Sequence, residues 1–146
     1  MQIFYLFAFF VFLLDRLTKY LILRADYTII EITSFLNLVK VWNKGVAFGF
    51  MGGSPETFQI LLTILIPLIM LLLYFYARKT DKFNKALLGI IFGGGLGNWL
   101  DRVSFGAVLD FIDIHYKNFH WPAFNVADLA ITIGLILLVA RNAFKN

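Results

Sequence analysis

Residues Thr57–Ala77 read TFQILLTILIPLIMLLLYFYA, a run in which no side chain carries a formal charge. A helix needs about 20 mainly apolar residues to cross the roughly 30 Å hydrocarbon core of a bilayer, and this run is long enough. Pro67 lies inside it, and a membrane helix tolerates a proline when a neighbouring group satisfies the carbonyl that the proline frees. The run therefore predicts a membrane-spanning helix.

The composition of the whole chain also indicates an integral membrane protein. Of its 146 residues, 60% are hydrophobic and 15% are charged, whereas about 25% of an average globular chain is charged. This balance excludes a disordered, coiled-coil or ordinary cytosolic protein. The chain has no cysteine, which excludes thiol nucleophiles, disulfide frameworks and cysteine-ligated metals. Its 13 basic residues form no long stripe, so nucleic acid is not an expected partner.

Three further apolar stretches, at about 3–23, 86–103 and 123–141, have the length of membrane spans. Together with the span at 57–77, they predict an all-α membrane protein of four transmembrane helices in one domain, residues 1–146. The first stretch is expected to be a retained helix, because it lacks the basic start and the small-residue cleavage site of a secretory signal peptide.

Basic residues predict the orientation of these helices. Residues 78–85 are rich in lysine and arginine, and the tail adds Arg141 and Lys145. Basic residues in short loops mark the cytoplasmic side, so both termini are predicted to be cytoplasmic. Segments 25–56 and 104–122 then lie outside. In segment 25–56, β-branched and aromatic residues alternate locally with polar ones, which predicts a small extracytoplasmic β-rich segment between the first two helices.

Several ionisable side chains lie inside the predicted spans, where each costs roughly 2.5–3.5 kcal/mol on insertion scales and therefore needs a role. Asp15 and Lys19 are four residues apart, so they share a helix face and can neutralise each other. This spacing favours a structural pair. Asp101 and Arg102 close the third span, where Arg102 is expected to extend toward lipid head groups.

A stripe of glycines marks one face of the third span. Gly89, Gly93 and Gly97 repeat every four residues and lead toward Asp101. Small residues at this spacing allow a neighbouring helix to approach closely. The run Gly93–Gly97 is not a phosphate-binding loop, because no Lys-Ser/Thr follows it. The stripe therefore predicts a tight helix contact.

Two other carboxylates have no basic residue within one helical turn: Asp110 and Asp128. Both are predicted at the outer boundary, with Asp128 roughly 9 Å inside the fourth span at 1.5 Å per residue. Two carboxylates in a low dielectric share one proton, so one can act as acid and the other as base in water-mediated peptide hydrolysis. Asn125 is expected on the same helix face as Asp128. Asp113 is a rival to Asp110, because periodicity alone does not choose between them.

The residues by themselves leave other functions open. The buried carboxylates could relay protons in a small proton- or ion-conducting carrier, although there is no internal repeat and the polar groups cluster on one side. The glycine stripe could also hold together a non-catalytic scaffold. His115 and His120 are interpreted as interfacial residues, because two histidines alone do not complete a typical metal site.

Five short blocks combine these residues into a recognisable pattern. They are Asp15–Lys19 (Asp-x-x-Thr-Lys), Asn43–Gly49 (Asn-x-Gly-x-Ala-Phe-Gly), Gly93–Arg102 (Gly-Gly-x-x-Gly-Asn-x-x-Asp-Arg), Val108–Phe111 (Val-x-Asp-Phe) and Phe124–Asp128 (Phe-Asn-x-Ala-Asp). With these blocks, in this order and from the first span to the fourth, the chain resembles the bacterial lipoprotein signal peptidases, also called signal peptidase II.

The resemblance implies an aspartic endopeptidase of the bacterial inner membrane. Such an enzyme removes the signal peptide from diacylglyceryl-modified prolipoproteins by cleaving just before the lipidated cysteine. Asp110 and Asp128 would be the catalytic pair near the outer face, which also decides against Asp113. The β-rich segment would form a platform or lid over the substrate. No metal or cofactor is implied, and we expect a monomer surrounded by membrane lipids.

The remaining block residues fall into two groups by the roles that the resemblance implies. The residues that would position the substrate are Asn43, Arg102 and Asn125. The residues that would hold helices and loops in place are Asp15, Lys19, Asn98 and Asp101.

Overall fold

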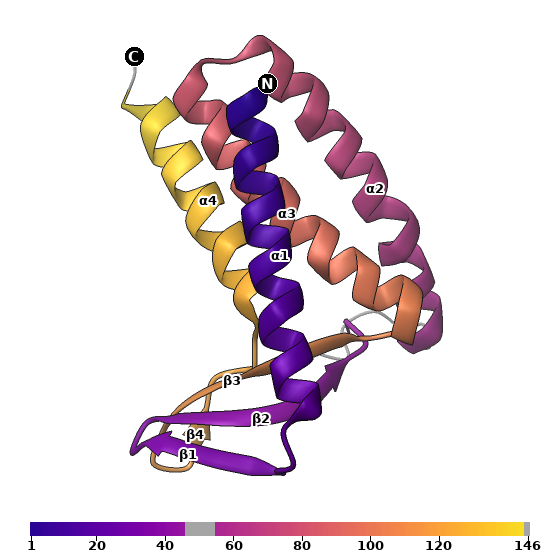
Figure 1. Ribbon diagram of the computed structural model, residues 1–146, viewed down its shortest axis with the longest axis vertical. Helices are drawn as coiled ribbons and strands as arrows, with labels where there is room; N and C mark the ends of the chain where they lie inside the picture. The colour runs from indigo at the N-terminus through magenta and orange to yellow at the C-terminus, as the bar shows by residue number, and fades with distance from the viewer. Residues whose placement is uncertain (46–54, 145–146) are drawn as a thin grey trace.

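The computed structural model describes residues 1–45 and 55–144 of the chain. Over these residues, the helices lie side by side and a small sheet covers one end of them (Figure 1). The helices are α1 (Gln2–Arg24), α2 (Pro55–Lys79), α3 (Lys82–Phe105) and α4 (Val126–Ala143). The strands are β1 (Ile29–Thr33), β2 (Leu36–Asn43), β3 (Val108–Tyr116) and β4 (Phe119–His120).

The central helix is α3, which contacts each of the other three helices. Its start follows from Asp81, whose carboxylate accepts hydrogen bonds from the backbone N–H groups of Phe83 and Asn84, both at 3.0 Å. Such an N-cap satisfies backbone donors that have no partner within the helix. The helix ends at Gly106, where φ is +67°, a left-handed conformation that glycine adopts without strain.

The first three predicted spans lie within α1, α2 and α3, although α3 begins at Lys82, about four residues before the predicted start. The fourth helix begins at Val126 rather than near residue 123. Among the described helices, Glu56–Lys79 and Val126–Ala143 are both long and apolar enough to cross a membrane. The other two, α1 and α3, carry buried charged and polar side chains that lower their hydropathy. A crossing by all four helices therefore stays a prediction.

The strands predicted between the first two helices are confirmed as β1 and β2, but the sheet does not end there. Its order is β1-β2-β3-β4, with antiparallel neighbours. The second outer segment supplies β3 and β4, which were not predicted from the sequence. The backbone groups on the free edge of β2 require a partner, and β3 provides it from far along the chain.

The tight helix contact predicted from the glycine stripe is confirmed between α1 and α3. A Cβ atom added to Gly89 would collide with the backbone oxygen of Phe4, and one on Gly93 would collide with that of Ala8. A Cβ on Gly97 would strike the carboxylate of Asp15. Only glycine allows the backbones to approach this closely.

We expect Gly93→Ala to lower the free energy of unfolding by about 1–3 kcal/mol, because the added methyl group forces the α1 backbone away from α3. Gly95→Ala is the matched control, since its Cβ would meet only Met70, at an ordinary 3.7 Å. Alanine has the better helix propensity, so the control should be neutral or slightly stabilising. Unfolding in mixed micelles measures both variants, and equal effects would contradict the tight contact.

The proline inside α2 is accommodated as expected. Pro67 has no N–H to donate to the carbonyl oxygen of Thr63, four residues earlier. The indole Nε1 of Trp99 on α3 donates to this oxygen instead, at 2.9 Å. The hydrogen bond satisfies the freed carbonyl and also fixes the Trp99 ring between α2 and α3.

Candidate active site

Four charged side chains form a closed ring between α1 and α3. The guanidinium of Arg16 lies 2.6 Å from Asp15 and 2.7 Å from Asp101. The Nζ atom of Lys19 lies 3.1 Å from Asp15 and 2.7 Å from Asp101. The predicted pairing of Asp15 with Lys19 is confirmed. Sequence reasoning missed Arg16, although its charge inside the first span also required a partner in another helix.

The two carboxylates of this charge ring also bind the backbone of neighbouring elements. Asp15 accepts a hydrogen bond from the N–H of Ala127, at the start of α4, at 3.3 Å. Asp101 accepts one from the N–H of Leu109 in β3, also at 3.3 Å. The ring therefore joins α1, α3, α4 and the sheet at one point.

Asn98 connects the charge ring to Asp128. Its Oδ1 atom accepts hydrogen bonds from Lys19 Nζ at 2.9 Å and from Asn125 Nδ2 at 3.1 Å. Its Nδ2 atom donates to Asp128 at 2.7 Å. Because Lys19 and Asn125 both donate to the oxygen, the amide of Asn98 must turn its nitrogen toward Asp128.

Asn125 and Asp128 form a capping box at the start of α4. The side chain of Asn125 accepts a hydrogen bond from the N–H of Asp128 at 2.9 Å, and the carboxylate of Asp128 accepts one from the N–H of Asn125 at 3.1 Å. Asn125 is thus the N-cap, not a residue on the helix face as predicted. Asp128 lies in the first turn, so its predicted depth inside the helix was wrong. Helix N-termini favour negative charge at this position.

The side chain of Asn125 also binds Asp110 and so connects it with Asp128. Its Nδ2 atom donates to Asp110 Oδ1 at 2.7 Å, while Asn43 Nδ2 donates to Asp110 Oδ2 at 2.9 Å. This meeting depends on the segment before α4, which runs back along β3: Phe124 exchanges two backbone hydrogen bonds with Ile112, at 2.8 and 3.1 Å. Asp110 and Asp128 therefore share Asn125 as a direct partner.

The Asn-x-Gly spacing of the second block has a local cause. The side-chain oxygen of Asn43 accepts a hydrogen bond from the N–H of Gly45 at 2.7 Å. This turn requires φ of +84° at Gly45, which glycine adopts without strain. The turn holds the amide nitrogen of Asn43 toward Asp110. Residues 46–49 of this block lie outside the described residues.

The structure separates Asp113 from this site. In a strand, residues three apart point to opposite faces, so Asp110 and Asp113 diverge. Asp113 accepts hydrogen bonds from Asn37 at 3.0 Å and pairs with His120 at 2.9 Å. Burial opposes the ionisation of Asp113, but the hydrogen bonds with His120 and Asn37 outweigh it and lower its pKa. The ring of His115 stacks on His120, with centroids 4.9 Å apart.

Asp110 is in the opposite electrostatic situation. Burial is the main cause that raises its pKa to about 6, and the nearby charge of Asp128 adds to the increase. The hydrogen bonds from Asn43 and Asn125 oppose this rise without cancelling it. A carboxyl group with such a pKa can hold or release a proton near neutral pH, as acid–base chemistry requires.

A groove of about 370 Å³ lies between α2, α3 and α4 and reaches Asp128, and we call it the Asp128 groove. It is lined by aliphatic side chains except where Asn98, Arg102 and Asp128 border it. Arg102 therefore lies in the groove, not extended away from the protein as expected. Its Nη1 donates to the backbone oxygen of Asn98 at 3.2 Å. Its buried Nε has no hydrogen-bond partner among the described residues.

Two solved structures resemble this chain in both fold and sequence. A bacterial membrane enzyme solved by the in meso method at 1.9 Å resolution has a TM-score of 0.78 to this chain and 34% sequence identity, covering 93% of this chain and 89% of its own. A second, solved at 2.3 Å, has a TM-score of 0.75 and 35% identity, covering 94% and 85%. These likenesses extend over almost the whole chain.

Sequence relatives of similar length are named lipoprotein signal peptidase. That of Pelagibacter ubique (strain HTCC1062) is 43% identical, over 93% of this chain and 84% of its own length. That of Thermodesulfovibrio yellowstonii is 42% identical, over 94% of this chain and 92% of its own length. The family model described as signal peptidase (SPase) II matches residues 7–144. The chain thus belongs to the signal peptidase II family and is a peptidase.

Proposed function

We propose that this peptidase removes the signal peptide from diacylglyceryl-modified prolipoproteins and cleaves just before the lipidated cysteine, with Asp110 and Asp128 as the catalytic pair. The main support for this proposal is that Asp110 and Asp128 both accept hydrogen bonds from Asn125. Relatives that are about 40% identical are named lipoprotein signal peptidase, which supports the substrate class. The residues provide an acid and a base without a metal or cofactor.

In the proposed mechanism, one proton is shared by the pair. We assign it to Asp110, because burial raises the pKa of this carboxyl group to about 6, so a fraction of the molecules carries the proton near neutral pH. Asp128, at the N-terminus of α4, acts as the base and takes a proton from a water held between the two carboxyl groups. As the water oxygen attacks the scissile carbonyl, Asp110 donates its proton to the carbonyl oxygen. Asp128 then passes its proton to the leaving amine, while the hydroxyl proton of the tetrahedral intermediate returns to Asp110.

Three other residues have proposed roles around the substrate. The Nε of Arg102, which has no hydrogen-bond partner in the described part of the chain, is a donor for a backbone carbonyl of the peptide in the Asp128 groove. Asn43 and Asn125 orient Asp110 through hydrogen bonds to its two oxygens. The charge ring and Asn98 support this arrangement from the α1 side.

The proposed topology places all four helices across the bacterial inner membrane, with both termini in the cytoplasm. The start of α1 and the end of α4 lie together, at the end of the helices remote from the sheet (Figure 1). Asp110 lies in β3, at the sheet end. The catalytic pair would then be near the outer face, under a sheet that acts as a platform or lid. We propose that the enzyme works as a monomer among membrane lipids.

A gel-shift assay of a diacylated prolipoprotein in detergent micelles tests this function. We expect the purified protein to cut the lipidated precursor and to leave the unlipidated one intact, because the lipid holds the scissile bond at the membrane boundary. Cleavage of both precursors would reject the lipid requirement. A folded preparation that cuts neither, but passes ions in sealed vesicles, would favour the carrier.

The raised pKa of Asp110 predicts a measurable effect on stability. Between about pH 4 and pH 6 the folded state holds a proton that the unfolded state has lost, so the free energy of unfolding falls as the pH rises. Asp110→Asn removes this dependence. Between pH 4 and pH 8, we expect the free energy of unfolding of the variant to rise by about 1–2 kcal/mol relative to that of the wild type, after allowance for solvent screening. Thermal unfolding of both proteins at the two pH values measures this, and a constant difference would contradict it.

A further inference from the structure

The helix α3 turns two adjacent faces toward α2. Gly95, Asn98 and Arg102 lie at helical spacing and border the Asp128 groove. Phe92, Leu96 and Trp99 lie at the same spacing on the next face and border a different cavity. The first face carries polar groups, whereas the second is aromatic and aliphatic.

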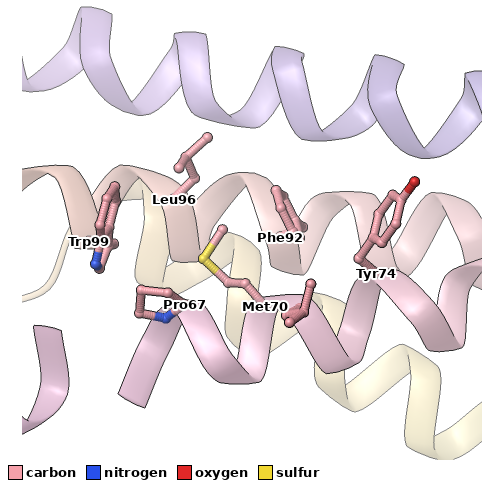
Figure 2. Close-up of a pocket in the computed structure, with 7 residues that line it drawn as sticks. Pro67, Met70, Tyr74, Phe92, Leu96 and Trp99 are labelled. Carbon is pink, nitrogen blue, oxygen red and sulfur yellow. The ribbon is translucent and has the colours of Figure 1, made fainter. Parts of the chain in front are cut away.

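The facing helix α2 is divided in the same way. Ile66, Ile69 and Leu73 line the Asp128 groove, and Met70 lines it with them. Residues of the next face line the second cavity: Pro67, Met70, Leu71 and Tyr74. Met70 belongs to both sets, and its side chain extends from α2 toward α3 (Figure 2). Two parallel grooves therefore lie on either side of Met70.

The second cavity, which we call the Trp99 groove, has a volume of about 230 Å³. Two of the side chains that line it, those of Trp99 and Tyr74, carry a hydrogen-bonding N–H or O–H group, and both groups already have partners within the protein. Trp99 Nε1 donates to the backbone oxygen of Thr63 at 2.9 Å, and the hydroxyl of Tyr74 lies 3.3 Å from that of Tyr5. These bonds hold both ends of the groove and leave a hydrocarbon surface between them, so a matching ligand is a hydrocarbon chain.

We propose that the Trp99 groove binds one acyl chain of the diacylglyceryl group of the substrate, which rests on the function proposed above. The lipid is attached to the residue after the scissile bond, so its chain must start near the carboxylates. Trp99 follows Asn98, which donates to Asp128. From Trp99 to Phe92 the groove extends for about 10 Å along α3, at 1.5 Å per residue. The peptide would occupy the Asp128 groove and the acyl chain the groove beside it.

Met70 suits the place where the two ligands would meet. Opposite it, α3 presents Gly95, which has no side chain, and a Cβ there would lie 3.7 Å from the Sδ atom of Met70. Methionine is flexible and adapts to irregular surfaces. Its thioether can therefore pack against the peptide on one side and the acyl chain on the other.

Photocrosslinking tests this proposal. A diacylglyceryl lipopeptide with a diazirine in the middle of one acyl chain is mixed with Asp110→Asn protein, which retains the substrate uncut, and labelled residues are mapped. We expect labels on residues that line the Trp99 groove and not the Asp128 groove, at Leu71 or Leu96. Labels spread evenly over the outer surfaces of the helices would overturn the proposal, and this map does not depend on any groove variant folding.

An adjacent pair of variants provides the matched comparison. Leu71 and Leu72 are both exposed, at 50% and 70%, but only Leu71 lines the groove. We expect Leu71→Trp to reduce the groove label about fivefold or more, because the indole occupies the space of the chain. In otherwise wild-type protein it should raise KM by a similar factor and leave kcat unchanged. Leu72→Trp should do neither, and equal effects of the two would overturn the proposal.

Two further arms separate this proposal from its alternatives. A phosphatidylcholine with the same diazirine chain replaces the lipopeptide in one arm. If it labels the groove as strongly and excess lipopeptide does not displace it, the groove binds bilayer lipid and the proposal is rejected. Cleavage of the lipopeptide by wild-type protein is measured in parallel. Its absence would reject the proposed function, whereas cleavage without groove labelling would reject only the acyl site.

Discussion

Asp110→Asn and Asp128→Asn are each expected to slow the cleavage of a lipidated prolipoprotein by about a thousandfold or more, within the range for loss of an acid or base. In the proposed mechanism the two groups share a single proton, so neither can act as acid or base when the other is absent. The double variant should therefore be no slower than either single variant, because residues that act as a unit have non-additive effects. Single-turnover cleavage in micelles measures all three.

Asp113→Asn is the matched control, since it removes a carboxylate three residues away on the same strand. Asp113 pairs with His120 and Asn37, not with the proposed catalytic groups. We expect its cleavage rate to stay within a few-fold of wild type. Full activity in Asp110→Asn, or a loss in Asp113→Asn as large as that in Asp110→Asn, would reject the assignment of the pair.

Lys19→Met is expected to lower the free energy of unfolding by about 3–5 kcal/mol, because removal of one member of a buried ion pair leaves the opposite charge without compensation. Lys19 is 3% exposed and contacts both Asp15 and Asp101 in the charge ring. It also donates to Asn98, so the connection to Asp128 should loosen as well. Unfolding in mixed micelles at neutral pH measures the loss.

Lys44→Met is the control for the loss of a lysine from an ion pair. Lys44 lies 3.5 Å from Glu56, and both side chains are exposed, at 55% and 66%. Exposed pairs contribute about 0–1 kcal/mol, so the control should be close to wild type. The double change Lys19→Met, Asp101→Leu should recover part of the stability, since it removes both charges. Similar small losses in Lys19→Met and Lys44→Met would contradict the role of the ring.

The sequence by itself determined those features that depend on neighbours along the chain. The length and apolarity of Thr57–Ala77 indicated a helix, and the spacing of four residues indicated both the Asp15–Lys19 pair and the glycine stripe. These predictions succeeded because one helical turn brings residues three and four apart together, whatever the rest of the fold does. The five blocks indicated the family for a similar reason, since they are read directly as linear patterns.

The tertiary structure alone decided which distant groups meet. Residue spacing did not choose between Asp110 and Asp113, whereas the register of β2 with β3 sets Asp113 opposite Asn37 and leaves Asp110 facing Asn125. The same holds for Arg16, whose contact with Asp101 joins two helices. Strand pairing and helix packing bring together residues that are tens of positions apart, and no local periodicity encodes those distances. The proposed catalytic pair is therefore a product of the fold, even though each of its members could be named from the sequence.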